Sequence, residues 1–283
     1  MIGAAAVALM AAAVGAASAT ATPKGEFAVF AQCPTSNTEL SGCLASRTES
    51  GYFKVGKQEV PIKNTQTLQG GLINTEPGFK ELVAALNGET LTKTPQNVPG
   101  GLADLVRCEE IEGSGLLEDL LRTACKTVFE NGLTGVNATA ELAVPASSVV
   151  LNLTHALSRS GTALKLPIKV KLENPLLGEE CYIGSNANPI ELELTTGTSG
   201  SLEGSKGENK SKAEGEIQVV EDSKLVDGTF SAPGVTGCGG LLSFLLDPIV
   251  NNKIGLPATS GNAAVLGGTV ELAGIEFVRE SEL

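Results

Sequence analysis

The sequence has no tryptophan and a single histidine, His155, among its 283 residues. A Ser–His–Asp hydrolase needs a histidine held between its nucleophile and its carboxylate. The sequence also lacks the GxSxG motif that would present such a serine. A lone histidine beside a strand is more often a surface or turn residue. We therefore expect no serine-hydrolase site around His155.

Motifs for metal and phosphate binding are also missing. The sequence has no CxxC pair and no EF-hand loop, so it offers neither a typical zinc site nor a typical calcium loop. The stretch LEGSKGENKS carries Ser205-Lys206-Gly207 where a phosphate-binding loop requires Gly-Lys followed by Ser or Thr. We predict no metal, no cofactor and, without a catalytic motif, no enzymatic activity.

Positive charge is scarce. The 20 Lys and Arg residues face 32 Asp and Glu residues, which gives a net charge of −12, and no basic run occurs. This balance excludes a nucleic-acid partner, which requires clustered cations, and a polybasic membrane-surface patch. Paired carboxylates of a glycosidase could be drawn at Glu109 with Glu112 or at Glu179 with Glu180. We interpret these pairs as solvated surface, since sugar sites also favour aromatic platforms.

The first residues have the composition of an export signal. Residues 2–19 are apolar and rich in alanine, and no charge occurs before Lys24. Small-x-small cleavage sites end at Ala19 and Ala21. We predict a cleaved signal peptide at 1–21 and a secreted, extracellular domain at 22–283, with no stable membrane span after cleavage. Because a basic segment is missing before the apolar stretch, we expect the natural start to lie upstream of Met1.

The cysteines agree with export. Six follow the predicted signal, and an even number in an exported chain indicates disulfide bonds. Six cysteines allow 15 pairings. Local spacing favours three bonds between neighbours along the chain: Cys33–Cys43, Cys108–Cys125 and Cys181–Cys238.

Strand patterns at both ends enclose a helical block. Residues 26–73 alternate as strands, residues 76–132 carry helical spacing over 79–86 and 117–128, and residues 133–278 return to strands. The fold class that this order predicts is α+β. It is mainly an antiparallel β-sandwich or open barrel, with a helical insertion at about 76–132 and a short helix near 239–247 that ends at Pro248.

The clearest strand has Leu164, Leu166, Ile168, Val170 and Leu172 on one face and Lys165, Pro167, Lys169 and Lys171 on the other. Residues 190–194 alternate in the same way, with Glu191 and Glu193 outside. If the two strands pair, their Lys and Glu side chains would face each other. Residues 198–215 have almost no large apolar side chain, which predicts a mobile loop or a long hairpin tip.

Several segments resemble a family of secreted actinobacterial proteins that has no assigned biochemical function. They are FAVFAQCP near the start, and ENPLLGEECYIGSNANPIELELTTGTSG, FSAPGVTGCGG and DPIVNNKIGLPATSGNAAVLGGTVELAG in the second half. The similarity is most specific around Cys33, Cys181 and Cys238. The resemblance implies export and a shared fold, and it assigns no catalytic residue.

Two segments, LLEDLLRTACKTVF and GLLSFLLDPIV, present wide leucine faces. The simpler interpretation is core packing against the sheet, with Leu120 in the core. The alternative is an apolar ligand face that would hold a lipid-like molecule. The residues of this predicted face are Leu117, Leu120, Leu121, Leu242 and Leu245.

Three functional hypotheses remain from the sequence. The first is a secreted, disulfide-stabilised, non-enzymatic extracellular protein of undefined molecular role. The second is a carrier or sensor of a hydrophobic, acyl-chain-like small molecule. The third is an enzyme whose site carries no recognisable motif. A sealed core would favour the first, an aliphatic tunnel the second, and a polar cleft with converging carboxylates the third.

Overall fold

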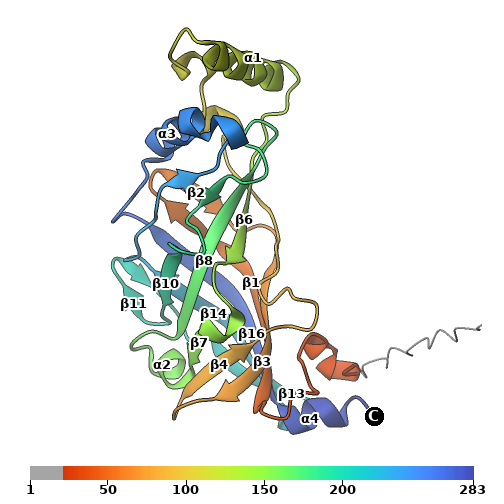
Figure 1. The fold of residues 1–283 in the computed structure, drawn as a ribbon. Helices are drawn as coiled ribbons and strands as arrows, with labels where there is room; N and C mark the ends of the chain where they lie inside the picture. Colours follow the sequence, from red (N-terminus) through yellow and green to blue (C-terminus); the bar gives the residue numbers. More distant parts are fainter. Residues whose placement is uncertain (1–21) are drawn as a thin grey trace, which may run out of the picture.

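The computed structural model describes residues 22–283, so the predicted signal peptide lies outside the described residues. The described part is elongated. Helix α1 (Leu116–Glu130) lies at one end beside α3 (Ser243–Ile254), and α4 (Ile275–Glu280) lies at the opposite end with the C-terminus (Figure 1). A long twisted sheet connects the two ends.

All strand pairs in this sheet are antiparallel, which confirms the predicted α+β class built mainly on antiparallel strands. The main path runs in this order: β13 (Glu208–Lys212), β14 (Ile217–Asp227), β16 (Ala263–Gly274), β1 (Gly42–Val55), β3 (Gln66–Asn74), β4 (Phe79–Val83), β7 (Val150–Asn152), β8 (Leu164–Glu173), β6 (Asn137–Leu142) and β5 (Gln96–Asn97). Four strands pair beside this path: β2 (Gln58–Pro61), β9 (Tyr182–Ile183), β10 (Ile190–Leu194) and β15 (Val235–Thr236).

The sheet curves back on itself, so that one arm, made of β14, β16 and β1, faces a second arm, made of β8 and β10. It is not closed into a barrel. Strand β10 pairs with β8 on one arm, and the residue after it, Thr195, forms an isolated bridge to Val226 of β14 on the other arm. The two backbone hydrogen bonds of this bridge are 2.9 and 2.8 Å long. The inner faces of the two arms therefore enclose a common interior.

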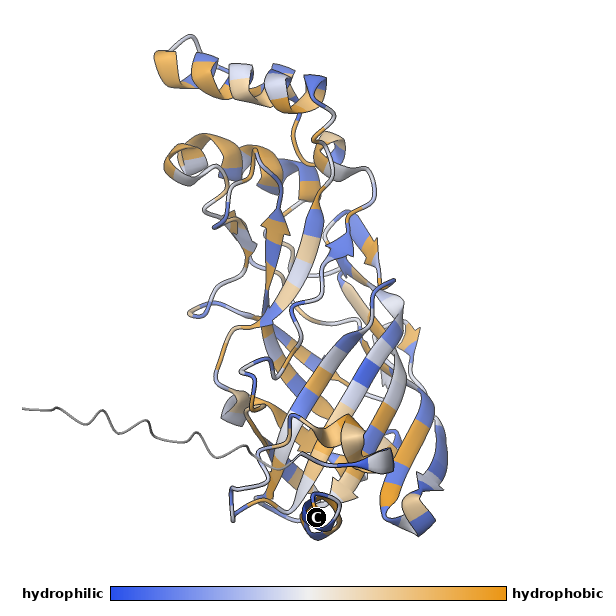
Figure 2. Ribbon diagram, turned by 90° about the vertical axis from the view of Figure 1, so that its right-hand side faces the viewer, coloured by the Kyte–Doolittle hydropathy of each residue, from blue (hydrophilic) through white to orange (hydrophobic). Residues whose placement is uncertain are grey.

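The alternation read from the sequence sets which side chains face this interior. Leu164, Leu166 and Ile168 of β8 are buried, and β10 pairs with β8 with Glu193 directly opposite Lys165. Lys165 also lies 3.6 Å from Glu191 as an ion pair. The bands of hydrophobic and hydrophilic colour along the long strands follow this period of two (Figure 2).

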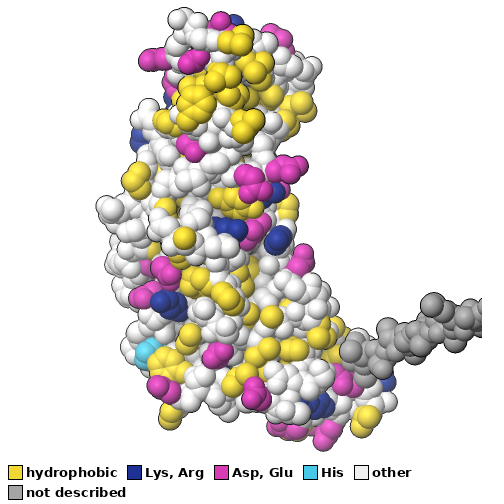
Figure 3. Space-filling model, in the orientation of Figure 1, with side chains coloured by type: hydrophobic (Ala, Val, Ile, Leu, Met, Phe, Trp, Pro, Cys, Tyr) yellow, Lys and Arg dark blue, Asp and Glu magenta, His cyan; other side chains and the backbone are white. Residues whose placement is uncertain are grey.

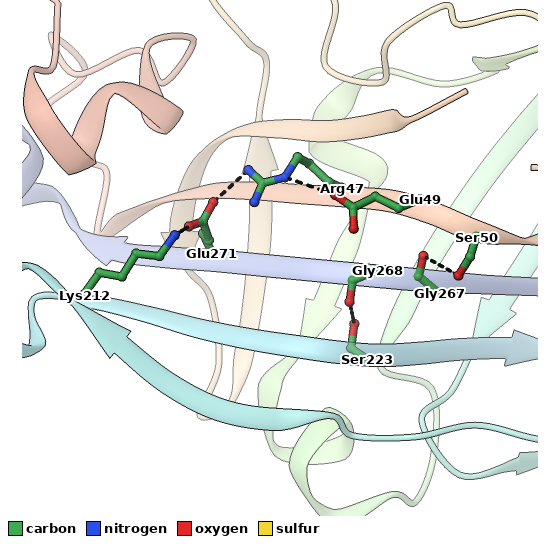
Figure 4. Close-up of polar contacts among 8 residues, drawn as sticks. All are labelled: Arg47, Glu49, Ser50, Lys212, Ser223, Gly267, Gly268 and Glu271. Carbon is green, nitrogen blue, oxygen red and sulfur yellow. Dashed lines mark hydrogen bonds and ion pairs between the residues drawn. The ribbon is translucent and has the colours of Figure 1, made fainter. Parts of the chain in front are cut away.

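The sheet bends where three strands meet at Gly267 and Gly268 of β16. The pairing of β1 with β16 shifts at Glu49, and the pairing of β14 with β16 shifts between Val220 and Ser223. The first irregularity lies opposite the two glycines, and the second lies opposite Thr269, next to Gly268. A Cβ on Gly268 would lie 1.9 Å from the carbonyl oxygen of Arg47, so the strands approach more closely here than any side chain allows. The Ser223 hydroxyl donates to the Gly268 carbonyl across the bend (Figure 4).

The strands at this bend lie between two apolar layers. The inner layer is the large cluster between the arms, which includes Leu44 of β1 and Leu164 of β8. The outer layer joins Ala45 of β1 to the 3₁₀ helix η1 (Gly25–Phe30) and to α4. Successive β1 residues thus enter different layers, as the alternation of a strand requires.

One carboxylate is buried in the outer layer. The Glu271 side chain of β16 is only 3% exposed, and its two oxygens accept hydrogen bonds from Arg47 of β1 at 2.8 Å and from Lys212 of β13 at 2.7 Å (Figure 4). The three residues lie on strands β1, β16 and β13. Because β14 lies between β13 and β16, the contact spans four neighbouring strands. Burial alone would raise the pKa of Glu271, but the hydrogen bonds from Lys212 and Arg47 outweigh it and lower the pKa below its ordinary value.

The helical block is smaller than the sequence predicts. The expected helix over 79–86 is wrong, because residues 79–83 form β4, which pairs with β3 and β7. Its apolar spacing fits a helix, but pairing with two distant strands decides its structure. Residues 101–108 hold only short 3₁₀ turns, η2 (Gly101–Asp104) and the start of η3 (Cys108–Glu110). The second predicted helix is confirmed as α1, and a further short helix, α2 (Leu153–Ser158), lies outside the block.

The predicted end of the helix near 239–247 is also wrong. A 3₁₀ turn, η6 (Gly240–Leu242), leads into α3, which continues through Pro248 to Ile254. Proline removes one backbone hydrogen bond of a helix. Leu246 and Val250 on either side of it are fully buried, and their burial offsets the loss.

The disulfide bonds are Cys33–Cys43, Cys108–Cys125 and Cys181–Cys238, the pairing that local spacing favours. Cys108–Cys125 holds α1 to the preceding turn. The segment 198–215 contains β11 (Thr198–Ser199), β12 (Leu202–Glu203) and β13, followed by the 3₁₀ turn η5 (Ala213–Gly215). A last 3₁₀ turn, η4 (Ala146–Ser148), precedes β7.

The bend can be tested by adding one methyl group. Gly268→Ala forces the strands apart at a backbone oxygen, so we expect it to lower the free energy of unfolding by about 1–3 kcal/mol in urea denaturation. The control is Gly135→Ala, because nothing lies within 4 Å of the added Cβ there. Its effect should stay within about 0.5 kcal/mol. Equal effects of the two substitutions would show that the close approach is unimportant.

The buried carboxylate makes stability depend on acid pH. Because folding lowers the pKa of Glu271, its contribution is complete above the unfolded-state value near 4.5 and is lost as the pH falls through the lower folded-state pKa. Glu271→Gln should therefore cost about 1–3 kcal/mol of unfolding free energy at pH 7. It should also reduce the loss of stability on acidification below about 4.5.

The matched control for this substitution is Glu221→Gln. Glu221 is a half-exposed carboxylate on the same sheet that pairs with Lys210. We expect a change within about 0.5 kcal/mol at pH 7, since exposed ion pairs contribute little. Urea denaturation of both variants between acid and neutral pH measures the difference, and the same acid dependence in wild type and Glu271→Gln would contradict the assignment.

Candidate functional site

The interior between the two arms is not filled. The larger of two neighbouring cavities has a volume of about 280 Å³ and lies between α2 and the strands β1, β3, β14 and β16. Its apolar wall is aliphatic. The apolar lining residues are Leu44, Leu68, Leu151, Leu153, Ala156, Leu157, Ala163, Leu164, Val220, Leu225, Val270 and Leu272.

The smaller cavity, of about 110 Å³, continues the space toward α3. All five inward residues of β8, from Leu164 to Leu172, line it, opposite Phe53 of β1 and Leu266 of β16. Four residues line both cavities and form a neck between them: Ser46, Leu68, Leu164 and Leu225. The two cavities therefore adjoin at this neck, and we call them together the passage.

Partly accessible leucines and valines identify this passage as unfilled core. Leu225, Leu266 and Val270 face inward and contact the large cluster, yet they are not fully buried. Inward-facing aliphatic side chains of a close-packed core would be covered. Small side chains at Ala138 and Ala140 of β6 leave further space in the wall.

The glutamine amides in the smaller cavity are already used by the protein, and the hydroxyls of Ser46 and Thr48 also line it. The Gln96 carbonyl oxygen accepts from the backbone nitrogens of Lys63 and Asn64 at 2.9 and 3.0 Å, and its amide donates to the Asn64 carbonyl. Gln58 donates to the Pro99 carbonyl. Because no charged residue lines this cavity, its chemistry suits an apolar chain and not a polar substrate.

The larger cavity reaches the surface, and its mouth is polar. Its exposed lining residues are Leu157 of α2, Lys206, Asn209 of β13 and Gln218 of β14. Helix α2 is held over one side by the Asn152 side chain, which accepts from the His155 backbone nitrogen at 3.0 Å, and by Thr196, which donates to the Ala156 carbonyl at 2.7 Å. The passage is therefore apolar inside and polar where it opens.

The predicted apolar ligand face lies elsewhere. Leu117 and Leu120 of α1 are 46% and 58% exposed, and Leu121 is buried. Leu242 and Leu245 are partly buried against the large cluster. None of the five lines either cavity. The expectation that Leu120 is core is wrong, because the inward side of α1 is narrower than its leucine pattern and carries Leu121, Cys125 and Val128.

A group of exposed apolar side chains lies at the end of the molecule that carries α1 and α3 (Figure 3). Leu116, Leu241 and Phe244 are exposed there, along with Leu117 and Leu120. This apolar end patch is separate from the mouth of the passage, which opens beside α2.

The other residues considered for catalysis line neither cavity. The Nδ1 of His155 donates to the Thr162 carbonyl at 3.0 Å, and its ring meets the edge of Phe79. Glu109, Glu112, Glu179 and Glu180 are exposed and line neither cavity.

Within residues 22–283, neither a metal-binding cluster nor a membrane-spanning helix is present. No group of three or more His, Cys, Asp or Glu side chains is placed to hold a metal ion, and no helix in this range has the length and apolar character needed to cross a membrane. Comparison with known proteins found no matching family model, no matching curated protein and no matching solved structure.

The mouth residues could not be identified from the sequence. Lys206 appears there only within a failed phosphate-loop pattern, and Asn209 and Gln218 carry no motif. The walls were visible as strand alternation at 164–172, but alternation alone does not distinguish a filled core from a cavity. The signal that could have suggested a cavity is the scarcity of aromatic side chains to fill a large β interior.

A matched pair on α1 tests the placement of its leucines. Leu121→Ala removes a side chain that is 2% exposed and should cost about 2–5 kcal/mol of unfolding free energy. Leu120→Ala removes a neighbour that is 58% exposed and should change stability by less than about 0.5 kcal/mol. Thermal and urea denaturation give both values, and a large loss for Leu120→Ala would place that side chain in a contact the structure lacks.

Proposed function

We propose that the protein is a secreted, non-enzymatic carrier or sensor that binds an acyl chain in the passage between the arms of the sheet. The observation that carries this proposal is the passage itself, an aliphatic space whose larger cavity reaches the surface. The proposal adds a molecular role to the hypothesis of a disulfide-stabilised extracellular protein.

The size of the passage supports a chain-like ligand. An apolar cavity of about 150 Å³ already holds a molecule such as benzene. The larger cavity alone measures about 280 Å³, and the two together exceed the ~300 Å³ at which small-molecule sites begin. The neck at Leu68 and Leu164 makes the space long and narrow, which favours an unbranched chain over a compact ring system.

The chemistry of the walls supports the same class of ligand. Leucine, isoleucine, valine and alanine dominate both linings. The amides of the inner cavity are occupied by backbone partners, so a polar ligand would find only the Ser46 and Thr48 hydroxyls there. Transfer of methylene groups from water to such a wall contributes about 0.8 kcal/mol each.

Three disulfide bonds and the predicted signal peptide support an extracellular setting.

Ligand binding can be measured by thermal shift and native mass spectrometry with dodecanol, a neutral probe with a single chain. A ligand that binds only the folded state adds about 2.7 kcal/mol of stability at a concentration of 100 times its Kd. We therefore expect a rise in Tm that saturates with dodecanol and a complex with one bound chain. Absence of both would overturn the proposed function.

The blocking variant is Ala156→Phe, which places a ring in the larger cavity from α2. We expect it to weaken dodecanol binding by roughly tenfold, the effect of an overpacking cost of about 1.4 kcal/mol. Ala124→Phe is the matched control, because Ala124 is an exposed residue of α1 and lines neither cavity. Equal weakening by both variants would contradict binding in the passage.

A further inference from the structure

The mouth of the passage has a single charged residue. Of all the residues that line the two cavities, only Lys206 carries a charge. It lies at the mouth with two neutral amides, Asn209 and Gln218. In a chain with 20 basic and 32 acidic residues, a lone cation without a lining carboxylate is an uncommon local charge balance.

Within the part of the chain that the structure describes, Lys206 has no ion pair within 4 Å and no side-chain hydrogen bond. Two carboxylates of the neighbouring strands have other partners. Glu203 pairs with Arg159 at 3.1 Å, and Glu221 pairs with Lys210. Glu208 and Asp222 lie on the β13–β14 hairpin but line neither cavity. The Lys206 ammonium is therefore free to pair with a ligand.

The backbone fixes Lys206 at this position. The preceding residue, Ser205, bridges to Lys224 of β14 through two backbone hydrogen bonds of 2.9 Å, and its hydroxyl accepts from the Gly207 nitrogen at 3.1 Å. The loop is thus pinned on both sides of Lys206 next to the start of β13. A long lysine side chain can place its stem on the apolar wall and its ammonium in water.

From this arrangement we infer that the ligand is an amphiphile with an anionic head, a fatty acid or a related chain carboxylate. Its head lies at Lys206, Asn209 and Gln218, and its chain extends past the neck toward α3. This inference rests on the proposed function. A carboxylate suits the site because it accepts hydrogen bonds from the ammonium and from both amides.

The test compares two probes that share one chain, laurate and dodecanol, at concentrations below micelle formation. We expect wild-type protein to bind laurate roughly three- to tenfold more tightly than dodecanol, as one partly exposed charge pair provides. Lys206→Met, which keeps an apolar stem and removes the charge, should abolish this preference and leave dodecanol binding unchanged. High salt should reduce the preference in wild type.

Lys224→Met is the matched control. Lys224 lies on β14 beside Ser205 and lines neither cavity, so its loss changes the net charge equally without altering the mouth. This variant should keep the preference for laurate. A charge reversal, Lys206→Glu, should favour dodecylamine over laurate.

The outcomes separate the two proposals. If wild type binds dodecanol and laurate equally, or if Lys206→Met keeps the preference for laurate, the assignment of the head group is wrong while chain binding stands. If neither probe binds wild type, the proposed function fails as well. Loss of the preference in both Lys206→Met and Lys224→Met would show an effect of net charge only, and it would also overturn the assignment.

Discussion

The close approach of three strands at Gly267 and Gly268 is the constraint on which the rest of the structure depends. Opposite or next to these glycines, β1 and β14 each carry an irregularity, and the inward set of residues shifts parity there. Ser46 faces inward before the shift and Phe53 after it. Bulges increase the twist and bend of a sheet, so they let one sheet curve around an interior while its outer face receives η1 and α4.

This curvature produces more interior than the side chains fill. Removing buried volume costs about 24 cal/mol per Å³ in a closed core, so an empty space of this size would cost several kcal/mol if it were sealed. The opening at the mouth and three disulfide bonds, each contributing about 2–4 kcal/mol, offset that cost. Glu271 also ties four strands together without adding to the core. The outer layer and the cross-links thus add stability that does not require the interior to be filled.

The sequence predicted much of the frame and little of the site. Alternation at 164–172 and 190–194 identified paired strands because one face is wet and the period of two is unambiguous. The helix expected at 79–86 failed because pairing of residues 79–83 with the distant strands β3 and β7 overrode the helical spacing of Phe79, Leu82, Val83 and Leu86. The cavity could not be predicted, because the same leucines form a filled core or an open wall. The difference is the distance between the arms, which non-local pairing and the glycine bend determine.

The net charge of −12 does not exclude an anionic ligand at this mouth. Charges in water are screened over about 8 Å at physiological ionic strength, so the groups near the ammonium decide the local potential. The residues that line the mouth with Lys206 include two neutral amides and no carboxylate, and Glu203 and Glu221 nearby have cationic partners. Farther inside, the wall is apolar and favours only the chain. The two ends of the proposed ligand would thus meet two different environments, and its direction of insertion would follow from that contrast and not from the overall charge.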